Sequence, residues 1–136
     1  MIWREQTKTL VKFAIVGVAN TLVGLCSIYL CKWLLSFGDV LANACGYSLG
    51  LALSFFLNRR WTFRHSGPLI PSLLRFLLIF MLAYMSNLAT VLALINAIGI
   101  DPYYAQAGGI LPYTVIFFFG GRFVAFRPYS IRADLR

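Results

Sequence analysis

The stretch LLRFLLIFMLAYMSNLATVLALINAI, residues 73–98, decides the fold class of this chain of 136 residues. It carries one charged residue, Arg75, close to its start. A helix that crosses the hydrocarbon core of a bilayer needs about 20 mostly apolar residues. Three further stretches are long and apolar enough for the same role. The predicted spans are roughly residues 13–35, 40–57, 73–98 and 103–124.

The composition leads to the same class. Hydrophobic residues make up 60% of the chain and charged residues 12%, whereas soluble domains carry about a quarter charged residues. These values exclude a water-soluble globular enzyme, and the abundance of apolar surface excludes a disordered chain. We therefore predict one all-α integral membrane domain over residues 1–136, made of four transmembrane helices.

The basic residues, which give a net charge of +8, gather in three of the five segments outside the spans. The two other segments hold Asp39 and Asp101, with Lys32 nearby. The positive-inside rule then predicts that both termini and the central loop face the cytoplasm and contact anionic lipid rather than nucleic acid. The basic residues concerned are Arg4, Lys8 and Lys12; Arg59, Arg60 and Arg64, with Arg75 just beyond; and Arg122, at the end of the fourth span, with Arg127, Arg132 and Arg136.

The two halves of the chain match at a shift of 63 positions without a gap. Lys12 falls on Arg75, and Arg59 falls on Arg122. This register favours two tandem helical-hairpin repeats, related by an axis along the membrane normal. The alternative is two pairs of helix ends that are similar independently. Further matches are Phe13 on Phe76, Ala44 on Ala107, Gly46 on Gly109, and Phe55-Phe56 on Phe118-Phe119.

Neutral polar residues lie within the apolar spans, where they are costly. One interpretation is that they form hydrogen bonds between helices. As a set, neutral donors and acceptors near several helix centres also suit a polyhydroxylated ligand better than an ion. The residues predicted to line a sugar path are Asn20, Asn43, Asn87, Gln106 and Tyr113.

No Asp, Glu or His lies inside a predicted span. This disfavours a proton-coupled multidrug exporter, which would need a buried carboxylate. The chain also shows no metal-ligand cluster, no cofactor motif and no nucleophile with a base, so we predict no enzymatic activity. His65 is expected to be a solvated loop residue. Cys26, Cys31 and Cys45 are interpreted as small packing residues rather than as a disulfide or metal framework.

The strongest local motif is FFLNRRWTFR, residues 55–64, which places arginines among aromatic rings at the predicted inner boundary. It could serve as an interfacial anchor. Alternatively, guanidinium groups bind phosphate bidentately, so Arg59 and Arg60, with Arg122, would capture a lipid phosphate. Lys12 and Arg75, at matching positions, would assist.

Three stretches together resemble the GtrA-like family: KFAIVGVANT (12–21), GY (46–47) and SFFLNRRWTF (54–63), with RF (75–76) and RFVAF (122–126) as less specific matches. The resemblance implies a multi-pass protein of the bacterial inner membrane, proposed to flip polyprenyl-phosphate-linked sugars and to work with a membrane glycosyltransferase. Asn20, Asn58, Arg59 and Trp61 match the family motif.

These observations predict translocation of a polyprenyl-phosphate-linked monosaccharide from the cytoplasmic to the outer leaflet. Because four helices cannot easily enclose a path as wide as a sugar phosphate, we expect a homo-oligomer, such as a dimer, or a groove open to lipid. The rival hypothesis is a non-transporting subunit that anchors or positions the glycosyltransferase.

Overall fold

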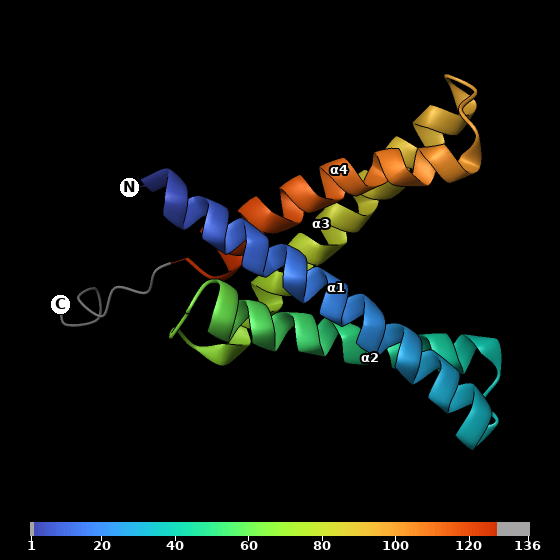
Figure 1. The fold of residues 1–136 in the computed structure, drawn as a ribbon, viewed down its shortest axis with the longest axis horizontal. Coiled ribbons are helices and arrows are strands. Elements are labelled where there is room, and N and C mark those ends of the chain that lie inside the picture. The colour runs from blue at the N-terminus through green and yellow to red at the C-terminus, as the bar shows by residue number, and fades with distance from the viewer. Residues whose placement is uncertain (1, 128–136) are drawn as a thin grey trace. The chain divides into compact units, whose positions relative to one another are not determined.

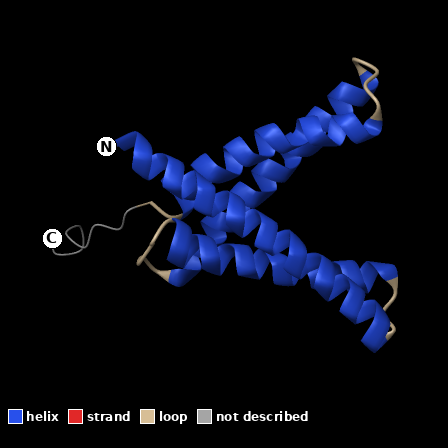
Figure 2. Ribbon diagram, viewed as in Figure 1, coloured by secondary structure: helices blue, strands red, loops and turns tan. Residues whose placement is uncertain are grey.

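The computed structural model describes residues 2–127, with side chains from Glu5 onward. Helices and short connections make up this part of the chain, and no strand occurs in it (Figure 2). The predicted all-α class is therefore confirmed. The elements are α1 (Ile2–Leu35), α2 (Asp39–Leu57), the π-helical turn η1 (Asn58–Thr62), α3 (Leu69–Asn96), α4 (Pro102–Gly120) and the π-helical turn η2 (Gly121–Ala125).

The chain divides into two compact units between Arg64 and His65. In the first unit, α1 and α2 pack side by side as a helical hairpin (Figure 1). Ser36 reverses the chain with a left-handed φ of 53°, and the Phe37 amide donates to the Cys31 carbonyl at 3.2 Å. Such a bond satisfies one of the carbonyls left free at a helix end. The hairpin then continues from α2 directly into η1.

The second unit is a hairpin of α3 and α4 (Figure 1). Gly99 makes the reversal with φ 78°, and the Ile100 amide donates to the Leu94 carbonyl at 3.0 Å. The Asp101 side chain accepts a hydrogen bond from the Tyr103 amide at 2.9 Å. This bond caps α4, which begins with proline, a residue suited to the first turn of a helix.

The structural elements of the two units recur at the shift of 63 residues. Both ends of α2 and both ends of η1 fall on the corresponding ends of α4 and η2. The left-handed residues Ser36 and Gly99 are also 63 positions apart. Each π-helical turn closes with the same bond, from Phe63 to the Asn58 carbonyl and from Phe126 to the Gly121 carbonyl, each at 2.8 Å.

Glycines set the close approach of the helices within each unit. A Cβ on Gly46 of α2 would lie 2.6 Å from the carbonyl oxygen of Gly24 in α1. A Cβ on Gly109 of α4 would lie 2.7 Å from the Asn87 amide nitrogen in α3. Glycine removes the side chain that would hold the backbones apart, which is the usual device for close packing of membrane helices.

Four helices are long and apolar enough to cross a membrane: Glu5–Leu35, Asp39–Thr62, Leu69–Asn96 and Pro102–Ala125. The predicted spans are confirmed in number and order, but their boundaries change. The largest change is at α1, which begins at Ile2 instead of residue 13. The residues between carry no proline or glycine, and Lys8 pairs with Glu5 one turn away at 3.0 Å, so the polar start remains helical.

Candidate functional site

A π-helical turn, η1, ends the first hairpin within the basic and aromatic motif. Asn58 and Thr62, the first and last residues of η1, are buried, with 1% and 5% of their surfaces exposed. The Asn58 amide nitrogen donates to the Ser54 hydroxyl at 3.2 Å. Because a π-helical turn carries one extra residue per turn, it changes the direction of the side chains that follow it. Arg59 and Arg60 lie inside this turn.

The cations of the motif are graded in exposure. Arg59 is half-buried, with its Nε atom inside the structure, whereas Arg60 is exposed. The Lys12 ammonium of α1 lies 5.5 Å from the centre of the Trp61 ring, a cation–π contact. One residue further on, the Phe13 ring lies 6.4 Å from the Phe63 ring. The structure thus brings Lys12, Arg59, Arg60 and Trp61 to the same end of the first hairpin.

The second hairpin places two predicted phosphate ligands at its own η2 end. Arg75 is half-buried and directly precedes Phe76, whose ring lies 5.8 Å from that of Phe126. Arg122 is half-buried in η2, with its guanidinium 5.6 Å from the Phe123 ring centre. The α3 start and the η2 turn therefore meet, as the α1 helix and η1 do in the first unit.

His65 is not the solvated loop residue that the sequence suggested. Its Nε2 atom is 2.8 Å from the Ser72 hydroxyl, and its ring packs edge-on against Phe126 at 5.8 Å. The Ser72 hydroxyl donates its proton to the Pro68 carbonyl at 2.7 Å, so Nε2 is the donor to Ser72. A lone histidine in a basic loop carried no periodic signal for this contact, which requires the long-range packing of η2.

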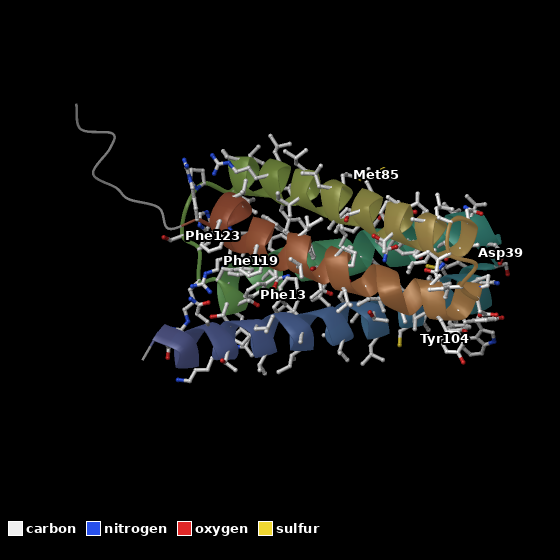
Figure 3. All side chains as sticks on the ribbon, turned by 90° about the horizontal axis from the view of Figure 1, so that it is seen from above. Phe13, Asp39, Met85, Tyr104, Phe119 and Phe123 are labelled. Carbon is white, nitrogen blue, oxygen red and sulfur yellow. The ribbon has the colours of Figure 1, made fainter. Side chains whose placement is uncertain are left out.

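The opposite end of each hairpin has a different charge. In the first unit the Lys32 ammonium is paired with the Asp39 carboxylate. In the second unit Asp101 caps α4. Figure 3 shows Asp39 and Tyr104 at the turns of their hairpins, and Phe13 and Phe123 toward the other ends of theirs. Each hairpin therefore has cations and aromatic rings at one end, and a neutralised or acidic group at its turn.

Two of the residues predicted for the sugar path lie between the helices of their own hairpin. Asn20 is half-buried, and its amide oxygen faces Gly50 of α2. A Cβ added to Gly50 would lie 2.4 Å from this oxygen. Asn87 is half-buried against Gly109. Within residues 2–127, no hydrogen bond is formed by either amide. An amide in an apolar span is costly without a partner, so both side chains can bind a further polar group.

The other residues predicted for the path differ in setting. Asn43 is exposed, and its amide nitrogen donates to the Asp39 carbonyl of its own helix at 2.8 Å. Gln106 is exposed on α4. Tyr113 is half-buried, with its ring 5.5 Å from that of Phe117. The structure therefore separates Asn43 from Asn20 in the first hairpin, and it places Tyr113 one turn beyond Gly109 in the second.

The π-helical turns are the feature that the sequence did not reveal. A single π-helical turn is too short to produce a hydrophobic periodicity that can be recognised in the sequence. The only sequence signal is that the cationic motif coincides with the end of an apolar run. Arg132 and Arg136 lie outside the described residues. Among residues 2–127, no group of three or more His, Cys, Asp or Glu side chains could hold a metal ion.

Four apolar helices, joined as two hairpins with cations gathered at one end of each, define a small multi-pass helical membrane protein. A scan of protein families matches residues 12–126 to the model described as GtrA/DPMS, transmembrane domain. This match covers most of the chain, so the protein belongs to the GtrA/DPMS transmembrane domain family, and the resemblance seen in its motifs is confirmed. A search of curated proteins finds no match.

Proposed function

We propose that this protein moves a polyprenyl-phosphate-linked monosaccharide from the cytoplasmic to the outer leaflet of a bacterial inner membrane. The observation that carries the proposal is the charge separation along each hairpin. Arg59 and Arg60 lie at the η1 end of the first hairpin, and Arg122 lies in η2 of the second. The turn of the first hairpin offers only a lysine already paired with Asp39.

The charge separation also suggests an orientation. Cations belong on the cytoplasmic side by the positive-inside rule, so we propose that both η ends and both termini face the cytoplasm. The two halves then act as tandem hairpin repeats of the same orientation. Membership in the family and the recurrence of element bounds at 63 residues support this arrangement.

The phosphate of the lipid is the first group to be recognised. Arginine forms paired hydrogen bonds with phosphate oxygens, and Arg59, Arg60 and Arg122 are the proposed ligands. Lys12 and Arg75 add positive charge at the same ends. Lys12 is also held by the Trp61 ring, which leaves its ammonium near the headgroup level where Trp side chains prefer to lie.

The sugar is the second group, and its hydroxyls need partners within the membrane. The amides of Asn20 and Asn87 are the proposed partners, because both are half-buried in a span and make no hydrogen bond within residues 2–127. The exposed Asn43 and Gln106 and the half-buried Tyr113 extend the proposed path. The polyprenyl tail would remain in the bilayer, beside the exposed apolar faces of the helices.

The driving force follows from the same residues. The four acidic residues of the sequence are Glu5, Asp39, Asp101 and Asp134. None lies in the middle of a span, so no carboxylate is available there to exchange a proton for cargo. We propose that transport follows the concentration gradient of the sugar lipid. A membrane glycosyltransferase would maintain this gradient by making the sugar lipid on the cytoplasmic side. A homo-oligomer would provide the width that four helices lack.

The test is reconstitution of the full chain in liposomes with a polyprenyl-phosphate hexose, measuring the fraction that becomes accessible to an external sugar oxidant. We expect the sugar lipid to move and an ordinary phospholipid to stay. Arg59→Ala should slow movement by about tenfold or more, since hydrogen bonds to charged groups contribute about 1.5–3 kcal/mol. Lys8→Ala is the matched control, because it removes one positive charge from a residue already paired with Glu5.

Two outcomes would contradict the proposal, the first its transport activity and the second its phosphate site. Folded protein that moves no sugar lipid would favour the rival hypothesis, a non-transporting subunit that positions a glycosyltransferase. Equal loss with Arg59→Ala and Lys8→Ala would show that general charge, rather than the motif, is required. Asn20→Ala and Asn87→Ala sharpen the distinction, because a positioning subunit needs its cations and packing faces but not these amides.

A further inference from the structure

The turn end of each hairpin carries large aromatic side chains that the proposed function does not use. Trp33 lies near the end of α1, and Tyr103 and Tyr104 lie in the first turn of α4. Their exposed fractions are 81%, 87% and 76%, and Figure 3 shows Tyr104 at the turn of its hairpin. We propose that these three residues form an aromatic belt that binds the headgroup region of the bilayer and fixes the depth of each hairpin in the membrane.

The polar atoms of these rings favour the headgroup region over the hydrocarbon core. Within residues 2–127, neither the Trp33 indole nor the hydroxyl of Tyr103 or Tyr104 forms a hydrogen bond with the protein. Such a donor is costly in hydrocarbon, whereas water and lipid oxygens accept from it at the boundary. Trp and Tyr side chains are enriched at membrane–water boundaries for this reason. The occupant of the belt is therefore the headgroup layer rather than the acyl chains.

The distance between the belt and the cations at the other end of each hairpin matches the thickness of a bilayer. Trp33 lies 21 positions after Lys12, which is about 32 Å along a helix. Arg122 lies 19 positions after Tyr103, which is about 29 Å at the same rise. The hydrocarbon core of a bilayer is about 30 Å thick. Each hairpin therefore has boundary side chains at both ends of a segment of the required length.

An ion pair beside Trp33 marks the same boundary. Lys32 of α1 pairs with Asp39, the first residue of α2, and the two side chains are 48% and 79% exposed. Charged groups with this exposure need water or headgroups around them. Arg59 follows Asp39 by 20 positions, which is about 30 Å along the helix. Helix α2 with η1 therefore gives the same thickness as α1.

The belt is not a consequence of the internal repeat. At the shift of 63, Trp33 corresponds to Asn96, and Tyr103 corresponds to Val40. The rings thus occupy the first helix of one hairpin and the second helix of the other. Both hairpins nevertheless carry them next to the turn. A shared environment at the turns explains this placement, whereas correspondence of the positions does not.

The belt determines which part of a long helix lies in the membrane. Helix α1 has 34 residues, or about 51 Å, which exceeds the hydrocarbon core. With Trp33 at one boundary and Lys12 at the other, residues 2–11 extend beyond the hydrocarbon on the side of the cations. The placement of the belt in the outer leaflet rests on the proposed function, because it uses the orientation proposed there. The depth of the belt does not depend on that orientation.

The test measures tryptophan depth in liposomes of phosphatidylcholine that carries bromine at defined positions of its acyl chains. The full chain with Trp3→Phe and Trp61→Phe keeps Trp33 as its single tryptophan. We expect Trp33 to lie about 15 Å from the bilayer centre, half of the core thickness, and to be quenched most by the shallowest bromine. Tyr103→Trp, in a chain whose three tryptophans are replaced by phenylalanine, should give the same depth.

Leu22→Trp in the same tryptophan-free chain is the matched control. Leu22 is 58% exposed on the same helix as Trp33 and lies about 16 Å from it along the axis. We therefore expect this tryptophan near the bilayer centre, with the strongest quenching from the deepest bromine. This result also shows that α1 is inserted in the liposomes.

Three outcomes would overturn the belt. Strongest quenching of Trp33 or of Tyr103→Trp by the deepest bromine would place the rings in the hydrocarbon core. Quenching only by acrylamide in the aqueous phase would place the turns in water. Protection from bromine and acrylamide alike would show that protein, such as a second copy of the chain, covers the rings.

Labelling of spheroplasts tests the leaflet separately. The three native cysteines, which are free, are replaced by alanine, and Gly38→Cys is added at the turn, where a Cβ meets no atom within 4 Å. A membrane-impermeant maleimide should label Gly38→Cys in intact spheroplasts, and the exposed position Thr7→Cys only after permeabilisation. The reverse pattern would overturn the outer placement. Neither experiment involves transport, so failure of the belt is distinguishable from failure to move the sugar lipid.

Discussion

The first hairpin, residues 2–64, and the second, residues 65–127, have the same backbone features but differ in the side chains between their helices. Both reverse at a left-handed residue and end in a π-helical turn, always 63 positions apart. Between the helices, however, Gly24 of the first hairpin corresponds to Asn87 of the second. The amide of the first hairpin, Asn20, is one turn away and faces Gly50 instead.

This difference shows what a hairpin in a membrane must keep and what it is free to change. The lengths of the apolar runs and the places where the chain reverses are kept. The positions of large and small side chains between the helices can change, provided that each large side chain faces a small one, because interiors tolerate rearrangement when the total volume is conserved. At the equivalents of Asn20 and Gly50, the second hairpin carries Ala83 and Tyr113, so the large residue has changed helix.

The largest expected difference between the hairpins is at their central glycines. In Gly46→Ala the new Cβ would meet the Gly24 carbonyl oxygen at 2.6 Å, and that backbone atom cannot move aside. We expect a loss of about 2–3 kcal/mol in the free energy of unfolding. In Gly109→Ala the close neighbours are the side chains of Asn87 and Val91 at 2.7 Å. These can rotate, so we expect a loss of about 1 kcal/mol or less.

Equilibrium unfolding in mixed micelles with increasing denaturing detergent would measure both glycine variants. Alanine also favours helix over glycine by about 1 kcal/mol, and this gain applies equally to the two positions. The difference between the variants is therefore the informative quantity. Equal losses would show that the first hairpin can spread as easily as the second, which would contradict the role of the Gly24–Gly46 approach.

A smaller difference is expected at Ser72 and Thr9, which correspond at the shift of 63. The Ser72 hydroxyl is buried, with 1% exposed, and bonds both the Pro68 carbonyl and His65 Nε2. In Ser72→Ala the His65 Nε2 atom loses this hydrogen bond, so we expect a loss of about 1–2 kcal/mol in the free energy of unfolding. Thr9 bonds only the Glu5 carbonyl of its own helix, and Thr9→Ala should change stability by no more than about 0.5 kcal/mol.

The same unfolding titration compares the two hydroxyl variants. Ser72→Cys serves as a control that keeps the shape of the side chain, with a slightly larger atom, while weakening the hydrogen bonds. A loss in Ser72→Ala as small as that in Thr9→Ala would mean that the His65 contact contributes nothing to the second hairpin. The packing of His65 on Phe126 would then be its main role.

Much of the fold could be predicted from the sequence, because apolar runs and loop charges act over distances of one helix. The four spans and the shift of 63 follow from such patterns. The helical start of α1 could not be predicted, since a polar stretch with a local Glu5–Lys8 pair resembles a tail. The burial of Asn58 and Thr62 depends on a π-helical turn, and the packing of the half-buried His65 depends on Phe126, directly after η2, so both needed three-dimensional packing.

The site could be predicted only in part, for a related reason. The motif predicts that cations and aromatic residues group together. The contact of Lys12 with Trp61 within the first hairpin agrees with this prediction. The path residues all looked alike in sequence, as neutral polar groups in apolar runs. Hydropathy cannot separate the interhelical Asn20 and Asn87 from the exposed Asn43 and Gln106, because their helix faces are set by the glycines of the opposite helix.

Small effects of opposite sign are expected at the two reversals. Ser36 and Gly99 both have left-handed φ values, 53° and 78°, a region that costs about 1 kcal/mol for residues with a Cβ. Gly99→Ala should therefore lose about 1 kcal/mol, and no steric clash contributes, since a Cβ there meets no atom within 4 Å. Ser36→Gly should raise the free energy of unfolding by about 0.5 kcal/mol. Glycine removes the backbone strain, but part of this gain is offset because glycine adds conformational freedom to the unfolded chain. Unfolding titrations of the two variants in the same micelles test this; a loss in Ser36→Gly would indicate that the Ser36 side chain stabilises the turn by more than its backbone strain costs.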